Sequence, residues 1–310
     1  MSRPAGDADD GAKSANQRSA PRCPVCGETR YTYVFSERGH RLLSCHDCEL
    51  LYIDPYPQQA DNQHHVVSEY DYDSLKILDC DRHYQASIMA YRSYWPRLRE
   101  EIRSATRMLD LGCGTGHLLE LACQLPGLRC VGIELNRERA AYARGRAPCE
   151  ILEVPIEDYE PAERFDVITL MDVFAHIPNV NDFFRAVRRL LKPNGKLIFK
   201  VGEMSRSIRK DAMHDWQIPD HLQFLGMKTM GWLAEKHGMT VVRHDRVPYA
   251  DELFAPALWR LSGRSTLRNF LKRSIVVTPF ALPLLASLYR LRHGNTIFSS
   301  LIVLTPAGDA

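Results

Sequence analysis

A glycine-rich stretch, Asp110-Leu-Gly-Cys-Gly-Thr-Gly116, constrains this chain more than any other part of its sequence. The residues before it, Arg107–Leu111, form a short apolar run that predicts a buried strand, and those after it, His117–Gln124, predict a helix. Glycine lets the backbone turn sharply and leaves room for a ligand, while the N–H groups at the start of the helix face a polar group. The order strand, glycine loop, helix therefore predicts a site for a nucleotide-like cofactor.

The residues around the loop narrow the class of cofactor. A second predicted strand, Leu128–Ile133, ends in Glu134, about twenty residues after the loop, where a carboxylate can accept hydrogen bonds from both ribose hydroxyls. His117 stands where the dinucleotide fingerprint GxGxxG has its third glycine. Asp110 suits a ligand with a cationic amino group better than a pyrophosphate. The pattern favours an adenosine-type cofactor other than a dinucleotide.

Strands and helices alternate along the rest of the chain. One predicted helix, Asp182–Leu191, carries its apolar residues on one face and ends at a Pro-Asn-Gly turn. We expect an α/β fold with a doubly wound, mostly parallel seven-stranded sheet, an antiparallel last strand, and ligands above the carboxyl ends of the strands. The other predicted strands are Glu150–Val154, Phe165–Asp172, Lys196–Val201 and a final pair expected to form the antiparallel edge, Met239–Val247 and Thr296–Leu304.

Two CxxC pairs near the N-terminus predict a metal site. Cys23 and Cys26 are separated from Cys45 and Cys48 by eighteen residues, which matches the spacing of a four-cysteine zinc site. The segment between the pairs predicts two strands joined by a turn, and hence a small N-terminal zinc ribbon. Four thiolates leave no position for an activated water, so the expected Zn2+ is structural. Four reduced cysteines without a metal are the alternative.

Four motifs resemble successive motifs of the class I methyltransferases that depend on S-adenosyl-L-methionine (SAM): MLDLGCGTGHLL, VGIELN, ERFDVITLMDVFAHIPN and LLKPNGKLIFKV. A later run, DHLQFLGMKTMGWLAEKHGMTVVRHD, resembles the later part of the same domain, and the resemblance covers roughly residues 22–305. A CPxCG ribbon directly before this core is similar to bacterial methyltransferases associated with modification of sugars, lipid-linked saccharides or secondary metabolites. The resemblance implies SAM as the cofactor and a small-molecule methyl acceptor.

The resemblance also implies roles for individual residues. The loop around the methionine part of SAM is matched by Asp110, Gly112, Gly114 and Gly116. Glu134 matches the ribose ligand. Ile156 and Glu157 match the positions that flank adenine, and Met171 and Asp172 match the positions beside the methyl group. The chain departs from the family at Ala175, where an acidic residue is common, so no carboxylate chemistry is expected there. It also departs at Pro155, where Asp or Gly is common, so we expect the adenine contact to rest on backbone.

Methyl transfer from a sulfonium needs alignment of the acceptor and exclusion of water rather than a metal or a covalent nucleophile. A hydroxyl acceptor also benefits from a general base near the methyl group. His176, just past the fourth strand, is the first candidate for that base, and a structural role capping the following turn is the alternative. His221 is the second candidate, because it lies in a loop after the fifth strand with three other potential acceptor contacts, His214, Asp215 and Asp220.

The order of these features predicts the domain boundaries. We expect a disordered leader over residues 1–22, the ribbon over 23–57, a helical linker or cover segment over 58–106, and the SAM-binding domain over 107–310 with an insert at 249–295. Tyr70 and Tyr72 in the linker could form a lid over the donor or pack against the core. The leader lacks the apolar centre of a secretory signal, and unpaired thiols suit a reducing compartment, so we expect a cytoplasmic protein.

The C-terminal insert suggests contact with a membrane. Its apolar run, Ser274–Leu291, contains two prolines and is short for a bilayer, which argues against a transmembrane helix. A cap over the active site is the interpretation that we favour. The other is peripheral contact of residues 267–292 with the inner face of the membrane, where a lipid-linked acceptor would be met. The flanking cations are Lys272, Arg273, Arg290 and Arg292.

The charge of the chain gives no strong nucleic-acid signature. Its formal net charge is +2, and the basic residues between Cys26 and Cys45 are only Arg30, Arg38 and Arg41. That number is too small for a surface that tracks phosphates. An enzyme with a small-molecule acceptor is therefore favoured. An RNA methyltransferase and a zinc-ribbon binding module on a non-catalytic scaffold remain the alternatives. The oligomeric state is not predicted.

Overall fold

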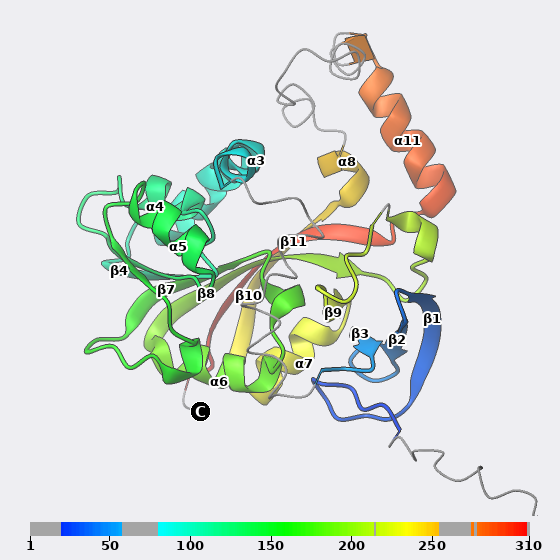
Figure 1. Cartoon of the computed structure of the whole chain (residues 1–310), viewed down its shortest axis with the longest axis horizontal. Coiled ribbons are helices and arrows are strands. Elements are labelled where there is room, and N and C mark those ends of the chain that lie inside the picture. The colour runs from blue at the N-terminus through cyan, green and yellow to red at the C-terminus, as the bar shows by residue number, and fades with distance from the viewer. Residues whose placement is uncertain (1–19, 58–79, 214, 254–273, 276–277, 309–310) are drawn as a thin grey trace, which may run out of the picture.

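The computed structural model describes residues 20–57, 80–213, 215–253, 274–275 and 278–308 (Figure 1). It confirms the expected α/β fold with a mostly parallel sheet. The centre of the sheet consists of parallel strands in the order β6-β5-β4-β7-β8. These strands are β4 (Arg107–Leu111), β5 (Arg129–Ile133), β6 (Glu150–Leu152), β7 (Phe165–Met171) and β8 (Leu191–Met204).

Two further strands extend the sheet beyond β8. β11 (Ile297–Pro306) pairs antiparallel with β8, and β10 (Met239–Pro248) pairs antiparallel with β11. β10 therefore runs parallel to β8 and ends this side of the described sheet. The expected final pair at the edge of the sheet, with an antiparallel last strand, is confirmed, and the structure adds that β11 lies between β8 and the edge strand β10.

The side chains of β4 alternate between the two faces of the sheet. Met108 packs in a buried cluster with Leu98 and Leu118, whereas Leu109 packs in a second cluster with Phe184. The first face is covered by α3 (Cys80–Ile102), α4 (His117–Ala122) and α5 (Arg137–Arg144), and the second by α6 (Val180–Leu190) and α7 (Thr229–Lys236). Helices on both faces make the sheet doubly wound and leave the carboxyl ends of its strands for ligands.

The N-terminal ribbon has an antiparallel sheet of its own, made of β1 (Tyr31–Glu37), β2 (His40–Cys45) and β3 (Leu51–Asp54). This small sheet is continuous with the large one. β3 pairs antiparallel with β9 (Gln223–Gly226), and β9 pairs parallel with the end of β8 (Figure 1). The ribbon is thus joined to the core by strand pairing.

The lengths of β7 and β8 explain where the ribbon attaches. β7 ends at Met171 opposite Lys200, and β8 continues for four more residues to Met204. β9 pairs with this overhang, with Leu225 opposite Glu203. Because the overhang lies at the carboxyl ends of the parallel strands, the ribbon lies on the side of the sheet where ligands bind in such folds.

Hydrogen bonds also hold the ribbon on the core. The Thr229 hydroxyl donates to the Cys48 carbonyl oxygen over 2.9 Å and accepts from the Gly226 N–H over 3.0 Å. The Lys236 Nζ donates to the Val25 carbonyl oxygen over 2.8 Å. A Cβ at Gly226 would lie 1.9 Å from the Glu49 carbonyl oxygen, so only glycine allows this approach.

The described part of the C-terminal insert contains α8 (Tyr249–Leu253) and α11 (Ala281–His293). Of the helices in the described ranges, none combines the length and the apolar character needed to cross a bilayer. The predicted lid residues Tyr70 and Tyr72 lie outside the described residues, as do His214, Lys272 and Arg273.

Candidate active site

The glycine loop has the backbone conformation that its sequence predicts. Gly112, Gly114 and Gly116 all have positive φ, at 64°, 56° and 85°. A Cβ at Gly112 would lie 2.5 Å from Cγ2 of Val173, so this glycine lets the segment after β7 pack closely. A Cβ at Gly114 would meet no atom of the described residues within 4 Å. Gly114 therefore borders open space, which suits a position that lets a ligand approach the backbone.

Asp110 is buried directly before the loop. Its Oδ1 accepts a hydrogen bond from the Thr169 hydroxyl on β7 over 2.6 Å. Burial first, and then the nearby Glu134, raise the pKa of Asp110 to about 7, although the Thr169 hydrogen bond lowers it. A carboxyl group with a pKa near 7 is partly protonated at neutral pH, and it ionises readily when a cation binds beside it.

Glu134 follows β5 and is joined to the glycine loop as the sequence predicts. Its Oε2 accepts from the Gly114 N–H over 2.8 Å, and its Oε1 accepts from the Asn136 N–H over 2.9 Å. A carboxylate has about four lone-pair sites, so both oxygens can still accept from a ligand's hydroxyl groups. The loop and the carboxylate thus form one hydrogen-bonded unit at the carboxyl ends of β4 and β5.

The residues expected beside adenine lie after β6. Ile156 is buried in the short helix η1 (Ile156–Asp158), and Glu157 next to it is exposed. Arg189 of α6 donates to the Glu157 carbonyl oxygen over 3.1 Å, which fixes this turn against the second face of the sheet. Both residues lie at the ligand side of the sheet, one strand beyond Glu134.

Met171 and Asp172 end β7, where the methyl group is expected. Met171 is buried, and Asp172 has a φ of 59°, a left-handed conformation that is uncommon for a residue other than glycine and often marks functional sites. The Asp172 carboxylate accepts from Lys200 Nζ over 2.8 Å. Sequence reasoning missed Lys200, although a lysine inside the apolar run of β8 was a signal that could have identified it.

The structure brings His176 and His221 together although 45 positions separate them. His176 belongs to η2 (Phe174–His176), just after β7, and the ring centroids lie 4.8 Å apart in an edge-to-face arrangement. His176 Nδ1 donates to the Asp220 carbonyl oxygen over 3.1 Å, so in the neutral ring Nε2 carries the lone pair. His221 Nδ1 is buried and has no hydrogen-bond partner among the described residues. Burial first, then His176, lowers the pKa of His221 to about 3.

The β8–β9 loop (residues 205–222), which carries His221, is supported by the ribbon. The Phe35 ring of β1 packs on Trp216 with 4.9 Å between ring centroids, and the Arg38 guanidinium donates to the Ile218 carbonyl oxygen over 3.0 Å. Arg38 also lies 3.6 Å from the exposed Asp215, which was one of the predicted acceptor contacts. These ribbon contacts link residues about 180 positions apart, and no local sequence pattern predicts them.

The four ribbon cysteines lie together as the spacing predicts. Their Sγ atoms all lie within 4.8 Å of one another, with 3.4 Å between Cys23 and Cys48 and between Cys26 and Cys45. In a tetrahedral zinc site with Zn–S bonds of about 2.3 Å, the sulfur atoms are about 3.8 Å apart. None of the four forms a disulfide, so the donor set suits a zinc ion.

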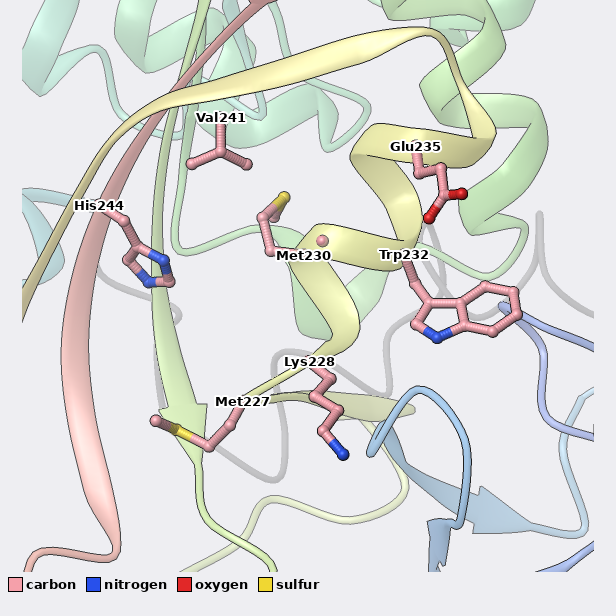
Figure 2. Close-up of a pocket in the computed structure, with 8 residues that line it drawn as sticks. Met227, Lys228, Met230, Trp232, Glu235, Val241 and His244 are labelled. Atoms are coloured by element: carbon pink, nitrogen blue, oxygen red, sulfur yellow. The ribbon is translucent and has the colours of Figure 1, made fainter.

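A separate hollow of about 430 Å3 opens on the face covered by α7 (Figure 2). Met230 and Trp232 of α7 and Val241 and His244 of β10 line it. β10 is separated from the glycine loop's strand β4 by β11, β8 and β7. None of the sequence-predicted site residues lines this hollow.

Comparison with known proteins defines the class. A family model described as a methyltransferase domain matches residues 81–244, which is 164 of the 310 residues. The chain therefore belongs to the methyltransferase domain family.

Curated relatives of the chain include ubiquinone biosynthesis O-methyltransferases. The protein of Rhodopseudomonas palustris (strain HaA2) is 33% identical over 115 residues, which are 36% of this chain and 44% of the relative. That of strain BisB5 is 30% identical over 187 residues, 51% of this chain and 67% of the relative. The chain thus spans less than half the length of the first of these relatives.

Solved structures agree on the fold. Haemonchus contortus phosphoethanolamine N-methyltransferase 2, in complex with SAM, superposes with a TM-score of 0.59 over 79% of this chain and 61% of its own, at 17% identity. At this identity the likeness concerns the fold alone.

We expect different outcomes from the substitution of Gly112 and of Gly114 by alanine. Gly112→Ala combines a positive φ with overlap against the stiff Val173 side chain and should cost more than about 2 kcal/mol of stability. Gly114→Ala meets no atom and should cost about 1 kcal/mol, the strain of the left-handed backbone alone, yet its methyl group would project towards bound SAM. Urea unfolding and calorimetric titration with SAM separate the two effects. A Gly114→Ala protein that binds SAM like the wild type would contradict the assignment of this open space to the donor.

Proposed function

We propose that the chain transfers the methyl group of SAM to a hydroxyl of a small-molecule acceptor, by in-line displacement. The acceptor would be a sugar, a lipid-linked saccharide or a secondary metabolite. We propose oxygen as the methylated atom because His176 and His221 lie together at the carboxyl end of β7. A base would be needed there to take the proton of a hydroxyl. The names of the relatives as O-methyltransferases support the same choice.

The residues that would hold SAM are those grouped around the glycine loop. Asp110 and the three glycines would take the methionine part, Glu134 the ribose, Ile156 and Glu157 the adenine, and Met171 and Asp172 the neighbourhood of the methyl group. The bound cofactor supplies a sulfonium methyl, which is the electrophile. The open space at Gly114 and the unit formed by Glu134 and the loop support this assignment.

His176 would act as the general base. With its Nδ1–H directed to the Asp220 carbonyl oxygen, the neutral ring offers Nε2 to the acceptor's proton. His221 is a poorer base at neutral pH, because burial keeps its pKa at about 3. Its neutral ring would instead position His176 through their edge-to-face contact.

The two histidines are distinguishable by kinetics. His176→Asn keeps a donor at a similar place to Nδ1 but removes the base, and we expect kcat to fall by about 100-fold or more with unchanged SAM affinity. His221→Phe keeps a neutral ring against His176 and should lose much less. Release of S-adenosylhomocysteine with a panel of phenols, sugars and hydroxy acids measures both. Full activity of His176→Asn on an acceptor that the wild type methylates would overturn the assignment.

Donor binding should depend on pH through Asp110. Since its folded-state pKa is about 7, the free protein carries Asp110 mostly protonated below pH 7, and a cationic donor must expel that proton on binding. The Kd for SAM should therefore rise as pH falls from 7.5 to 5.5, by up to about tenfold per unit below pH 7, with proton release visible in buffers of different ionisation enthalpy. Asp110→Asn should bind weakly with no such dependence. A wild-type Kd that is constant over this range would exclude Asp110 as the partner of the cation.

The ribbon cysteines would hold one structural Zn2+. Cys48→Ser should abolish stoichiometric zinc, measured by plasma mass spectrometry, and destabilise the chain by about 2 kcal/mol or more, a fall in Tm of at least roughly 4 °C. Cys149→Ser, a half-buried thiol outside the ribbon, is the matched control and should keep the metal. Wild-type protein purified without chelators that contains no zinc would count against the proposal.

We propose that the enzyme is located in the cytoplasm at the inner face of the membrane, which residues 267–292 would contact. The part of this segment before residue 274 lies outside the described residues. Its later part, α11, belongs to the described structure.

A further inference from the structure

One face of α11 carries apolar side chains that the described structure leaves exposed. Phe280, directly before the helix, is 82% exposed, and Leu284, Leu288 and Leu291 are 59%, 52% and 83% exposed. Their spacing of four, four and three residues places them on one side of a helix. These four residues, which we call the α11 apolar face, form a continuous stripe and not scattered single exposures.

The opposite side of α11 attaches the helix to the protein. Leu282 and Ala286 are buried, and the Tyr289 hydroxyl donates to the Ala212 carbonyl oxygen over 2.6 Å. Figure 1 shows the C-terminal end of α11 against the body and its N-terminal end projecting away. The apolar face is therefore directed away from the protein by the same contacts that hold the helix.

Basic residues surround the attached end of α11. Arg292 is 72% exposed and lies 3.7 Å from Asp211. Arg209, the N-cap of the neighbouring η3 (Lys210–Ala212), and Lys210 are 78% and 53% exposed and pair with Asp211 and Glu37, so three cations share two carboxylates there. In the sequence, residues 254–308 contain no Asp or Glu. They contain seven cations: Arg260, Arg264, Arg268, Lys272, Arg273, Arg290 and Arg292. An apolar stripe whose helix end carries exposed cations, in a stretch of sequence without Asp or Glu, is complementary to an anionic lipid surface.

We propose that the α11 apolar face docks on an anionic bilayer and lies in its interfacial layer, without spanning it. A second copy of the chain is a poorer occupant, because a symmetric contact between two such faces would bring the same cations together. The proposal rests on the proposed function in one respect, namely the acceptor. Ala212 lies in the β8–β9 loop that carries His221, so docking would hold the acceptor side of the site next to the lipid surface.

Vesicle flotation with the full chain tests the proposal. The probes are vesicles of phosphatidylcholine alone and with 30 mol% phosphatidylglycerol (about one anionic lipid in three), at low and high salt. We compare the wild type with Leu284→Ser/Leu288→Ser/Leu291→Ser. The matched control, Tyr33→Ser/Trp232→Ser/Val242→Ser, removes three other exposed apolar side chains.

We expect the wild type and the control to float with the anionic vesicles, more weakly at high salt, and the α11 variant to bind at least about tenfold more weakly. Absence of wild-type flotation, or equal loss in both variants, overturns the proposal. So does a wild type that sediments as a dimer while the α11 variant is a monomer, because the face is then an interface between copies. A large fall in Tm of the α11 variant, without any flotation of the wild type, would show that the chain's own residues cover the face.

Calorimetric titration with SAM in the absence of lipid keeps this test separate from that of the proposed function. All three proteins should bind SAM alike. Normal flotation without SAM binding would overturn the function and leave the docking surface, and normal SAM binding without flotation would do the reverse.

Discussion

The proposed acceptor side of the site depends on the overhang of β8 beyond β7. A strand end that projects from a sheet exposes backbone N–H and C=O groups, which must find partners. Here β9 pairs with it, β3 pairs with β9, and the ribbon is thereby held at the carboxyl edge of the parallel strands. The ribbon then supports the β8–β9 loop, and this loop brings His221 to His176. The proposed structural zinc would act on catalysis through this chain of contacts, without touching a substrate.

The donor side follows a different principle, the burial of carboxyl groups. Asp110 and Glu134 lie at the ends of neighbouring parallel strands, and the low dielectric around them makes their charges costly. Glu134 offsets that cost with backbone N–H groups, one of them from the glycine loop itself. Asp110 has a single hydroxyl partner on β7, and so its charge is the one that a cationic donor would stabilise most.

Much of the fold and of the donor site could be predicted from the sequence, because both depend on short-range patterns. The glycine loop, the carboxylate that ends the next strand and the two CxxC pairs each involve residues close in the chain, and the structure places them as expected. The final pair of strands forms the sheet edge as expected, but its order, with β11 beside β8 and β10 outermost, could not be predicted because β10 and β11 look alike as isolated apolar runs. Lys200 was missed because it lies in a buried strand, although it binds Asp172.

The sequence by itself determined the α/β class, the conformation of the glycine loop and the four clustered thiols, since backbone conformation and donor type follow from residues at fixed short spacing. Only the tertiary structure decided that His176 meets His221, that the ribbon contacts the loop beside them, and that one face of α11 is exposed. The physical reason is the same in all three cases. Contacts across 45 to 180 positions, and the side of a helix that lacks a partner, depend on how whole elements pack, and no local pattern of residues specifies that packing.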